Sequence, residues 1–272
     1  MIAIVTAGLA LAVASAAPAP PSRPASTPER LSERSLDQPL RIDSTETDGR
    51  LHGEIRAVIE HPFRRVRVLA DPAHWCELLT LLPNIRHCRT AADRQQLTLR
   101  FARRFDEPVA DTHAVRFDVR TRLLDDLLEI VLRAPDGPVG TSDYRLELTA
   151  VPVGEGRVSL RVQYGYAYGL TARLLSRAYL ALGGRDKVGF TVVGTDAEGN
   201  PQYIDGSRGA VERNAMRLYL AIDAYLDVVD EAPGKRRERS LRAWLDAIAG
   251  YPRQLAEADP AAYFEAKREQ LP

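Results

Sequence analysis

The most regular hydrophobic pattern in the chain lies between Ser207 and Val229. Its apolar residues recur at spacings of three and four, at Val211, Ala215, Leu218, Ile222, Tyr225 and Val229. This spacing places them on one face of a helix, with Glu212, Arg213 and Arg217 mostly off that face and solvated. Ser207 is suited to cap the first turn. The pattern predicts a long helix that needs a broad apolar surface to lie on.

Alternating apolar and polar residues predict a series of strands before this helix. The first runs from Leu51 to Ile59, and its apolar face carries Leu51, Gly53, Ile55, Ala57 and Ile59. The remaining strands are expected at 97–101, 115–120, 127–133, 144–149 and 158–168. Strict alternation gives each strand one buried and one solvated face, which is typical of antiparallel sheets. Because turns join consecutive strands, we expect an α+β fold in which an antiparallel sheet wraps around the long helix, with an apolar cavity between them.

Three shorter segments have helical patterns. Pro62 to Leu69 and Pro72 to Leu82 each open with a proline, which the first turn of a helix tolerates, and Asp71 is suited to cap the second. Leu170 to Leu182 has an apolar face of helical spacing and ends at a Gly-Gly pair. This segment is either a mobile lid over the cavity, in transient contact with a membrane, or a helix packed permanently against the sheet.

Composition divides the chain into four regions. Residues 1–16 are small or apolar, carry no charged side chain and end in Ala-Ser-Ala, which is typical of a signal peptide. Residues 17–50 are rich in proline and small polar residues, which predicts a linker. Residues 51–230 contain the sheet and the long helix. Residues 231–272 are expected to form a helical C-terminal extension.

Charge and cysteine content bear on the class of binding partner and on the cellular compartment. The 37 basic and 37 acidic residues balance, so no basic excess indicates binding to nucleic acid. The signal-like N-terminus predicts a periplasmic or secreted location. An oxidising compartment permits a disulfide between Cys76 and Cys88, and two buried free thiols are the alternative.

The order of these elements resembles that of a known family. The segment Leu51 to Arg89, LHGEIRAVIEHPFRRVRVLADPAHWCELLTLLPNIRHCR, combines a strand, a proline-led helix, an Asp-Pro, a tryptophan-bearing helix and a Leu-Pro. With the later strands and the long helix, about Leu51 to Val229, it resembles the START-like, or SRPBCC, superfamily. The resemblance implies a helix-grip fold whose cavity binds lipids, sterols, hormones or polyketides, and some members are enzymes. One departure is Gly169 to Gly206, which separates the last strand from the long helix and contains an expected hairpin.

Candidate ligand-binding residues lie on the expected strands and on the long helix. Tyrosines 164, 166 and 168 share one strand face and offer apolar rings with hydroxyls that can orient a polar group; ordinary core packing is the alternative. Two arginines of the helix are suited to an anionic ligand, and a solvated helix face is the alternative. The full set of candidates is Phe117, Tyr144, Tyr164, Tyr166, Tyr168, Arg213, Arg217, Leu218 and Ile222.

The sequence contains no strong catalytic, metal-binding or cofactor-binding motif. Its five histidines are scattered, and none forms the i, i+4 pair of a helical metal site. We therefore expect no cofactor and no metal. The leading expectation is a secreted or periplasmic START-like protein that binds or carries an apolar small molecule, such as a lipid. Two alternatives stay open: an enzyme of the same fold, such as a cyclase or hydrolase that uses His113, a tyrosine hydroxyl and an arginine, and a non-catalytic envelope protein that docks a partner.

Overall fold

The computed structural model describes residues 40–169, 187–256 and 259–268, which belong to one compact unit. The expected signal peptide at 1–16 and the apolar segment at 170–182 lie outside the described residues, so both stay predictions. Among the described helices, none is long and apolar enough to cross a membrane.

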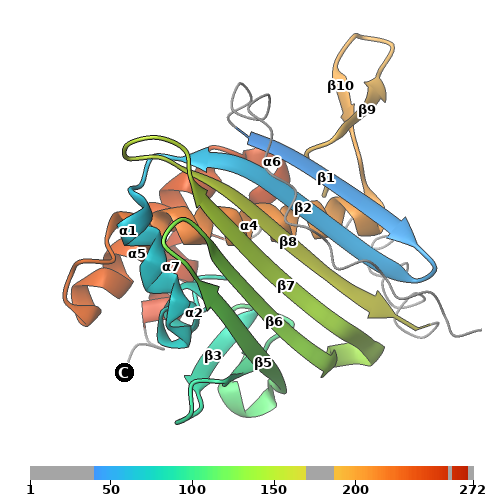
Figure 1. Ribbon diagram of the computed structural model, residues 1–272. Coiled ribbons are helices and arrows are strands. Elements are labelled where there is room, and N and C mark those ends of the chain that lie inside the picture. The colour runs from blue at the N-terminus through green and yellow to red at the C-terminus, as the bar shows by residue number, and fades with distance from the viewer. Residues whose placement is uncertain (1–39, 170–186, 257–258, 269–272) are drawn as a thin grey trace, which may run out of the picture. The chain divides into compact units, whose positions relative to one another are not determined.

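The described residues contain a large antiparallel sheet in which neighbouring strands are consecutive in the sequence, except that β2 lies beside β8 (Figure 1). The order across the sheet is β1-β2-β8-β7-β6-β5-β4-β3. The strands are β1 (Leu40–Thr47), β2 (Arg50–Ile59), β3 (Ile85–Thr90), β4 (Gln96–Phe101), β5 (His113–Leu123), β6 (Leu128–Asp136), β7 (Thr141–Pro152) and β8 (Val158–Tyr168). All five predicted strands of the meander are confirmed. Their side chains alternate as expected, so each strand has one buried face.

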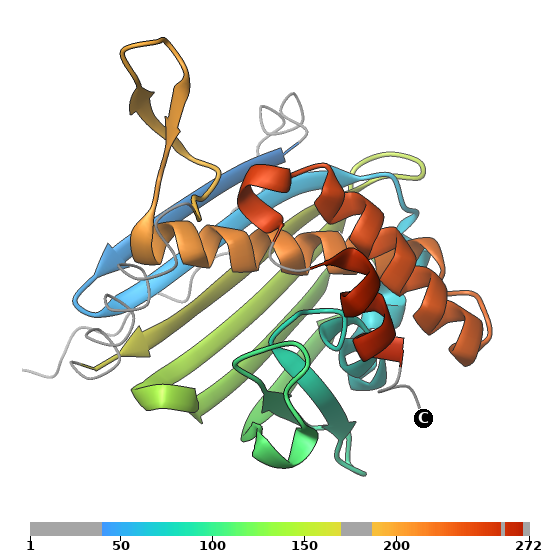
Figure 2. The same ribbon diagram turned by 180° about the vertical axis from the view of Figure 1, so that it is seen from behind.

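Helices cover one face of this sheet, and a two-stranded hairpin projects beyond it (Figures 1 and 2). The helical segments between β2 and β3 are α1 (Phe63–Val66), the 3-10 turn η2 (Arg67–Ala70) and α2 (Pro72–Leu79). Short 3-10 turns also lie at Val109–Asp111 and Pro138–Gly140. The predicted hairpin is β9 (Val192–Thr195) and β10 (Pro201–Tyr203). The later helices are α4 (Gly206–Asp227), α5 (Pro233–Ala249), α6 (Pro252–Leu255) and α7 (Pro260–Arg268).

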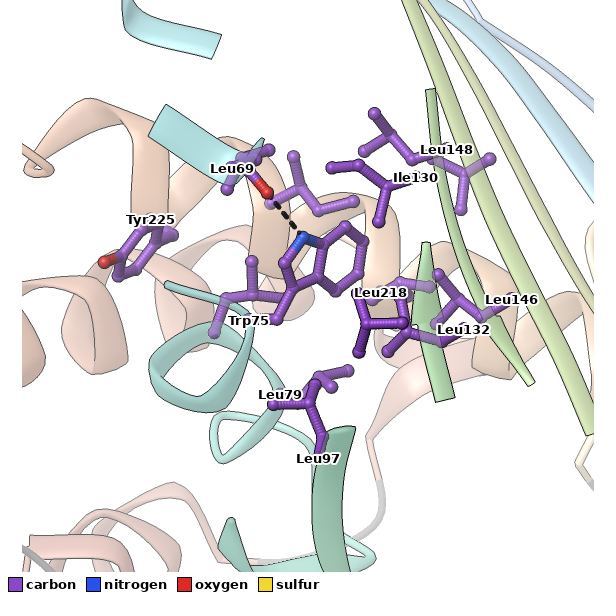
Figure 3. Packing of buried hydrophobic residues seen from close by; sticks show 14 of the residues in the cluster. Leu69, Trp75, Leu79, Leu97, Ile130, Leu132, Leu146, Leu148, Leu218 and Tyr225 are labelled. Carbon is purple, nitrogen blue, oxygen red and sulfur yellow. Dashed lines mark hydrogen bonds between the residues drawn. The ribbon is translucent and has the colours of Figure 1, made fainter. Parts of the chain in front are cut away.

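The predicted long helix is confirmed as α4, and its apolar face packs against the sheet. Leu218 and Ile222 are buried with the inner-facing residues of the strands, and Figure 3 shows Leu218 beside Leu132 of β6. Each large apolar side chain buried in this way contributes about 1.5–3 kcal/mol. Near its start, α4 passes so close to β2 that a Cβ on Gly53 would lie 3.3 Å from the carbonyl oxygen of Val211. A sheet wrapped around one long helix is the predicted α+β helix-grip fold.

The tryptophan-bearing helix of the opening segment is confirmed as α2. The Asp71 carboxylate accepts a hydrogen bond from the backbone N–H of Ala73 at 2.9 Å, so Asp71 caps this helix as expected. Trp75 is fully buried, and its indole N–H donates to the carbonyl oxygen of Leu69 at 2.9 Å (Figure 3). The indole thereby fixes α2 against η2 while its rings fill the core between α4 and the sheet.

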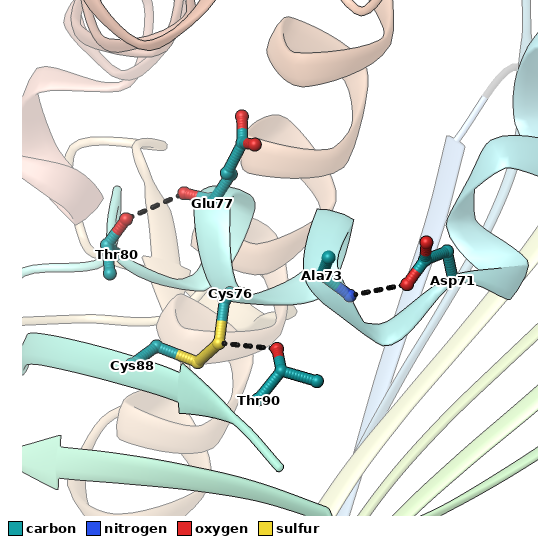
Figure 4. Close-up of a disulfide and its surroundings, with 7 residues drawn as sticks. All are labelled: Asp71, Ala73, Cys76, Glu77, Thr80, Cys88 and Thr90. Atoms are coloured by element: carbon teal, nitrogen blue, oxygen red, sulfur yellow. Dashed lines mark hydrogen bonds between the residues drawn. A yellow bond between two sulfur atoms is a disulfide. The ribbon is translucent and has the colours of Figure 1, made fainter. Parts of the chain in front are cut away.

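The two cysteines form the predicted disulfide (Figure 4). Cys76 of α2 is bridged to Cys88 of β3, with the two Cα atoms 5.1 Å apart. Thr90 Oγ1 lies 3.5 Å from Cys76 Sγ and donates to it. The bridge holds α2 against the edge strand of the sheet.

The predicted linker, 17–50, extends too far, because its last residues form β1. Leu40–Thr47 pairs with β2 along its whole length. Leu40 and Ile42 pack against the apolar cluster that lies between α4 and the C-terminal helices, and Ser44 is buried. Burial of these apolar side chains stabilises the short segment as a strand. The proline-rich composition of the preceding residues gave no indication of this strand.

The prediction that Glu212, Arg213 and Arg217 stay solvated is wrong. All three are buried, at 0%, 4% and 5% exposure. The segment before the β9–β10 hairpin and the C-terminal helices cover this side of α4. The predicted cap at Ser207 is also wrong, because Asp205 occupies the N-cap position and makes no side-chain cap bond.

Glu212 joins three parts of the chain. Its Oε1 atom accepts hydrogen bonds from the hydroxyls of Ser44 (2.5 Å) and Thr191 (2.8 Å). Its Oε2 atom accepts from the backbone N–H groups of Phe190 (2.7 Å) and Thr191 (2.9 Å). Arg208 also reaches Ser44, through its side-chain hydroxyl and backbone carbonyl. One buried carboxylate therefore ties α4 to β1 and to the approach to the hairpin.

The region predicted as a C-terminal extension, 231–272, contributes to the core. Trp244 of α5 and Tyr263 of α7 are buried against α4, and the Trp244 indole donates to the carbonyl oxygen of Arg217 at 3.1 Å. Lys267 of α7 is 4% exposed, and its ammonium donates to the carbonyl oxygens of Thr80 (2.8 Å), Leu82 (2.7 Å) and Ile85 (2.6 Å). The C-terminal helices are thus fixed to α4 and to the loop after α2.

Candidate functional site

A small cavity lies between α4 and the concave face of the sheet. We call it the inner pocket; it has a volume of about 50 Å³. Its lining includes Leu79, Ile85, Phe117, Tyr144, Tyr164 and Leu218. A space of this size holds only a few waters or a short apolar group. The predicted cavity between the sheet and the long helix therefore exists, but side chains fill most of it.

Aromatic rings from neighbouring strands form one wall of the inner pocket. Tyr144 of β7 stacks on Tyr166 of β8 with ring centroids 5.3 Å apart and planes inclined by 15°. Tyr164 and Phe117 lie at 6.4 and 6.2 Å from the same ring. Tyr144 meets the two tyrosines of β8 because adjacent antiparallel strands place side chains of one face next to each other, and Phe117 of β5 reaches the same ring across β6. Three strands thus hold a cluster of four aromatic rings, of which Phe117, Tyr144 and Tyr164 line the inner pocket.

The hydroxyls of this wall are neutral. Burial raises the pKa of Tyr144, Tyr164 and Tyr166 above that of an exposed tyrosine. The Tyr144 hydroxyl lies 3.0 Å from Thr141 Oγ1. Within the part of the chain that the structure describes, the Tyr164 hydroxyl has no hydrogen-bond partner. It is therefore suited to donate to a ligand or to a water in the inner pocket.

The structure brings together five of the nine candidate residues from the sequence: Phe117, Tyr144, Tyr164, Arg217 and Leu218 all line the inner pocket. The other four lie elsewhere. Tyr166 stacks behind Tyr144, and Ile222 is fully buried in the packed core. Tyr168 donates from its hydroxyl to Glu46 at the far end of the sheet. Arg213 lines a second space.

This second space, which we call the outer groove, has a volume of about 760 Å³. Trp244, Leu245 and Ile248 of α5 and Leu255 of α6 give it apolar walls, together with Tyr263 of α7 and Phe105 of the β4–β5 connection. α4 contributes Ala210, Arg213, Asn214 and Arg217 to its lining. Its volume lies in the range of about 300–1,000 Å³ that is usual for small-molecule sites.

Three residues line both spaces: Asn84, Asn214 and Arg217. We call them the neck. Asn84 follows α2, and its backbone carbonyl accepts from the N–H of Ala102 at 2.8 Å. Arg217 Nη1 donates to the side-chain oxygen of Asn214 at 3.2 Å, one turn earlier on α4. The neck lies between a large amphipathic groove and the small aromatic pocket.

The sequence interpretation missed most of the groove. Asn84, Trp244 and Tyr263 were not candidates, because the groove uses the loop after α2 and helices assigned to an extension. A signal existed on α4, where Ala210, Asn214 and Arg217 recur at spacings of four and three. This second stripe indicates another contact face, but its polar composition resembles that of a solvated surface.

The histidine expected in the enzyme alternative does not lie at this site. His113 is exposed on β5, where it pairs with Phe101 of β4. His74 donates to or accepts from the Tyr225 hydroxyl at 2.6 Å, next to a Glu77–Arg236 ion pair that joins α2 to α5. Burial lowers the pKa of His74. Among the described residues, no group of three His, Cys, Asp or Glu side chains is placed to hold a metal ion.

No protein-family model and no curated protein matches the sequence. Solved structures that the chain is similar to include the lipid transfer and protein localization domain of human StarD13, at 13% identity, covering 52% of this chain and 77% of that chain with a TM-score of 0.33. A START superfamily protein from Mycobacterium smegmatis is 14% identical, with 49% and 95% covered and a TM-score of 0.31. A norcoclaurine synthase from Thalictrum flavum is 12% identical, with 54% and 87% covered and a TM-score of 0.33.

At these scores the likenesses carry no argument about function. The fold follows from the strand order itself. β2 leads through two short helical segments to β3, the meander returns to β8 beside β2, and α4 lies in the curve of the sheet. The described residues therefore have a START-like, helix-grip fold.

Proposed function

We propose that the protein binds an apolar small molecule in the outer groove, with one end of the molecule at the neck and the inner pocket. The observation that supports the proposal is that the two spaces adjoin, with Asn84, Asn214 and Arg217 lining both. The volumes support this pose, because the groove is large enough for the body of a ligand and the inner pocket only for its end. Buried rings of Trp244 and Tyr263 supply a rigid apolar surface.

A tryptophan at position 210 is expected to block the groove. Ala210 lies on α4 in the groove lining, half-buried, so Ala210→Trp fills space without displacing packed core atoms. We expect the affinity for the neutral fluorescent probe N-phenyl-1-naphthylamine to fall about tenfold or more, because the indole takes apolar surface from the probe. Fluorescence titration measures the affinity.

Ala262→Trp on the exposed face of α7 is the matched control and is expected to leave the probe affinity unchanged. Equal affinities in wild-type protein and Ala210→Trp would place the probe outside the groove. Native mass spectrometry of gently extracted protein then identifies the natural ligand.

We also propose that the chain is exported. The small, uncharged residues 1–16 and the Cys76–Cys88 bridge support this, since disulfides persist in oxidising compartments. Protein recovered from the periplasm or the medium is expected to begin at Ala17 and to contain no free thiol under denaturing, non-reducing conditions. An intact Met1 or two reactive thiols contradict export. Contact of 170–182 with a membrane stays a prediction.

A further inference from the structure

The inner pocket contains a phenol hydroxyl that no other described residue engages. Tyr164 of β8 lies on the same strand face as the buried Leu160 and Val162, so its ring points to the side of the sheet that α4 covers. Among the hydrogen bonds that the described residues make, none involves its hydroxyl. Polar groups inside a folded protein usually have a partner, because they lose their bonds to bulk water. The Tyr164 hydroxyl is therefore a candidate contact for whatever occupies the pocket.

Tyr164 faces an internal space rather than bulk water. It lines the inner pocket and is only half-buried by its accessible surface. Burial nevertheless raises the pKa of Tyr164 well above that of an exposed tyrosine, with smaller contributions from Tyr144 and Tyr166. A side chain that keeps accessible surface while protein atoms surround it faces a cavity. The hydroxyl therefore stays protonated at neutral pH and keeps its proton as a donor.

The neighbouring hydroxyl, that of Tyr144, has already donated its proton. Thr141 Oγ1 gives its single proton to the carbonyl oxygen of Pro138, since a carbonyl can only accept. In the 3.0 Å contact between Thr141 Oγ1 and the Tyr144 hydroxyl, Tyr144 is therefore the donor. Tyr144 and Tyr164 are the tyrosines in the described lining, so the phenol proton that remains for a ligand is that of Tyr164.

Resting on the proposed function, we infer that the ligand end in the inner pocket carries an uncharged oxygen, a hydroxyl or a carbonyl, that accepts a hydrogen bond from Tyr164. The pocket volume of about 50 Å³ limits this end to a short group. A carboxylate is disfavoured, because a neutral phenol does not offset the cost of removing a charge from water. The two arginines of the lining are already engaged, Arg145 with Glu147 and Arg217 with Asn214. Tyr164 thus determines the specificity for the end group.

The test is the change in affinity that Tyr164→Phe causes for four ligands with ten-carbon chains and different end groups: decan-1-ol, decan-2-one, 1-chlorodecane and decanoate. Each displaces N-phenyl-1-naphthylamine from the full-length protein at pH 7.5, below its micellar or solubility limit. Phenylalanine keeps the ring that packs against Tyr144 and Tyr166 and removes only the hydroxyl. Comparing each compound between wild-type protein and the variant cancels the hydration of the compound itself.

We expect the affinities for decan-1-ol and decan-2-one to fall about fivefold in Tyr164→Phe, which corresponds to one neutral hydrogen bond. The affinities for 1-chlorodecane and decanoate are expected to change by less than about twofold, because neither end group depends on the phenol proton. Circular dichroism and thermal melting establish that the variant is folded. Its melting temperature is expected to match that of the wild type, because the hydroxyl has no hydrogen bond to lose.

Two further variants locate the effect. Tyr203→Phe on β10 is the matched control, because it removes a phenol hydroxyl that lines neither the inner pocket nor the outer groove, and all four affinities are expected to stay unchanged. Tyr144→Phe tests which phenol is the donor. Because the Tyr144 proton is bound to Thr141, the affinity for decan-1-ol is expected to fall less than in Tyr164→Phe.

The outcomes separate this inference from the proposed function. Equal changes for decan-1-ol and 1-chlorodecane in Tyr164→Phe overturn the hydrogen bond to the ligand. A loss for decanoate as large as that for decan-1-ol overturns the uncharged end group. Both results leave the groove as the proposed apolar site. Failure of all four compounds and of the neutral probe to bind wild-type protein overturns the proposed function itself.

Discussion

Replacing Glu212 by alanine is expected to lower the free energy of unfolding by about 3–5 kcal/mol. The carboxylate is fully buried and accepts four hydrogen bonds, from Ser44, Phe190 and Thr191. Alanine leaves these donors without an acceptor in a site that bulk water does not reach. Urea denaturation followed by circular dichroism measures the loss.

Two further variants test this explanation. Glu212→Gln keeps the shape but turns an amide toward donors, so an intermediate loss is expected. Glu238→Ala on the exposed face of α5 removes only a surface pair with Arg242, and a change below about 0.5 kcal/mol is expected. If Glu212→Ala is no more destabilising than Glu238→Ala, the carboxylate does not hold β1 and the hairpin segment to α4.

Replacing Lys267 by methionine is expected to lower the free energy of unfolding by about 2–4 kcal/mol. Methionine keeps most of the apolar stem but removes the three bonds to the carbonyls of Thr80, Leu82 and Ile85. Burial and the nearby charge of Arg86 lower the pKa of Lys267, while the three carbonyl oxygens favour its charged form. The variant removes the buried charge as well, so the expected loss comes from the three buried carbonyl oxygens that lose this donor.

Lys267 also positions the loop after α2, and this gives a second readout. Leu82 and Ile85 line the inner pocket, so a loosened loop is expected to weaken binding of the neutral probe in addition to lowering stability. Lys235→Met, an exposed position in α5, is the control and is expected to change neither quantity. A Lys267→Met protein with wild-type stability would show that α7 does not hold this loop.

The part of the fold that the sequence predicted rests on local patterns. Each strand of the meander shows alternation within its own few residues, and α4 repeats its apolar residues at helical spacing from Val211 to Tyr225. Asp71 and Pro72 mark the start of α2 in the same local way. These patterns can be interpreted without knowing which segment packs against the element, because the period of the side chains alone identifies the buried face.

The wrong predictions share a physical cause: each concerns residues whose burial depends on a segment far away in the sequence. Glu212 and Arg213 have the pattern of a solvated face, but residues 187–191, β1 and the C-terminal helices bury them. The outer groove depends on α5 to α7, whose packing onto α4 is not visible in their own composition. The aromatic wall could be predicted because Tyr164 and Tyr166 belong to a single strand. The neck could not, since it joins α4 to a loop more than a hundred residues earlier.

The position of β2 in the sheet has a consequence for how the protein is made. β2 is synthesised early, yet its inner neighbour β8 is made only after β3 to β7. Until α4 leaves the ribosome, the face that carries Leu132, Leu146 and Leu148 lacks the long helix that covers it in the folded protein. Long-range strand pairing of this kind is slow, and a nascent chain with an uncovered apolar sheet is prone to aggregate. A chain released before residue 206 is therefore expected to aggregate.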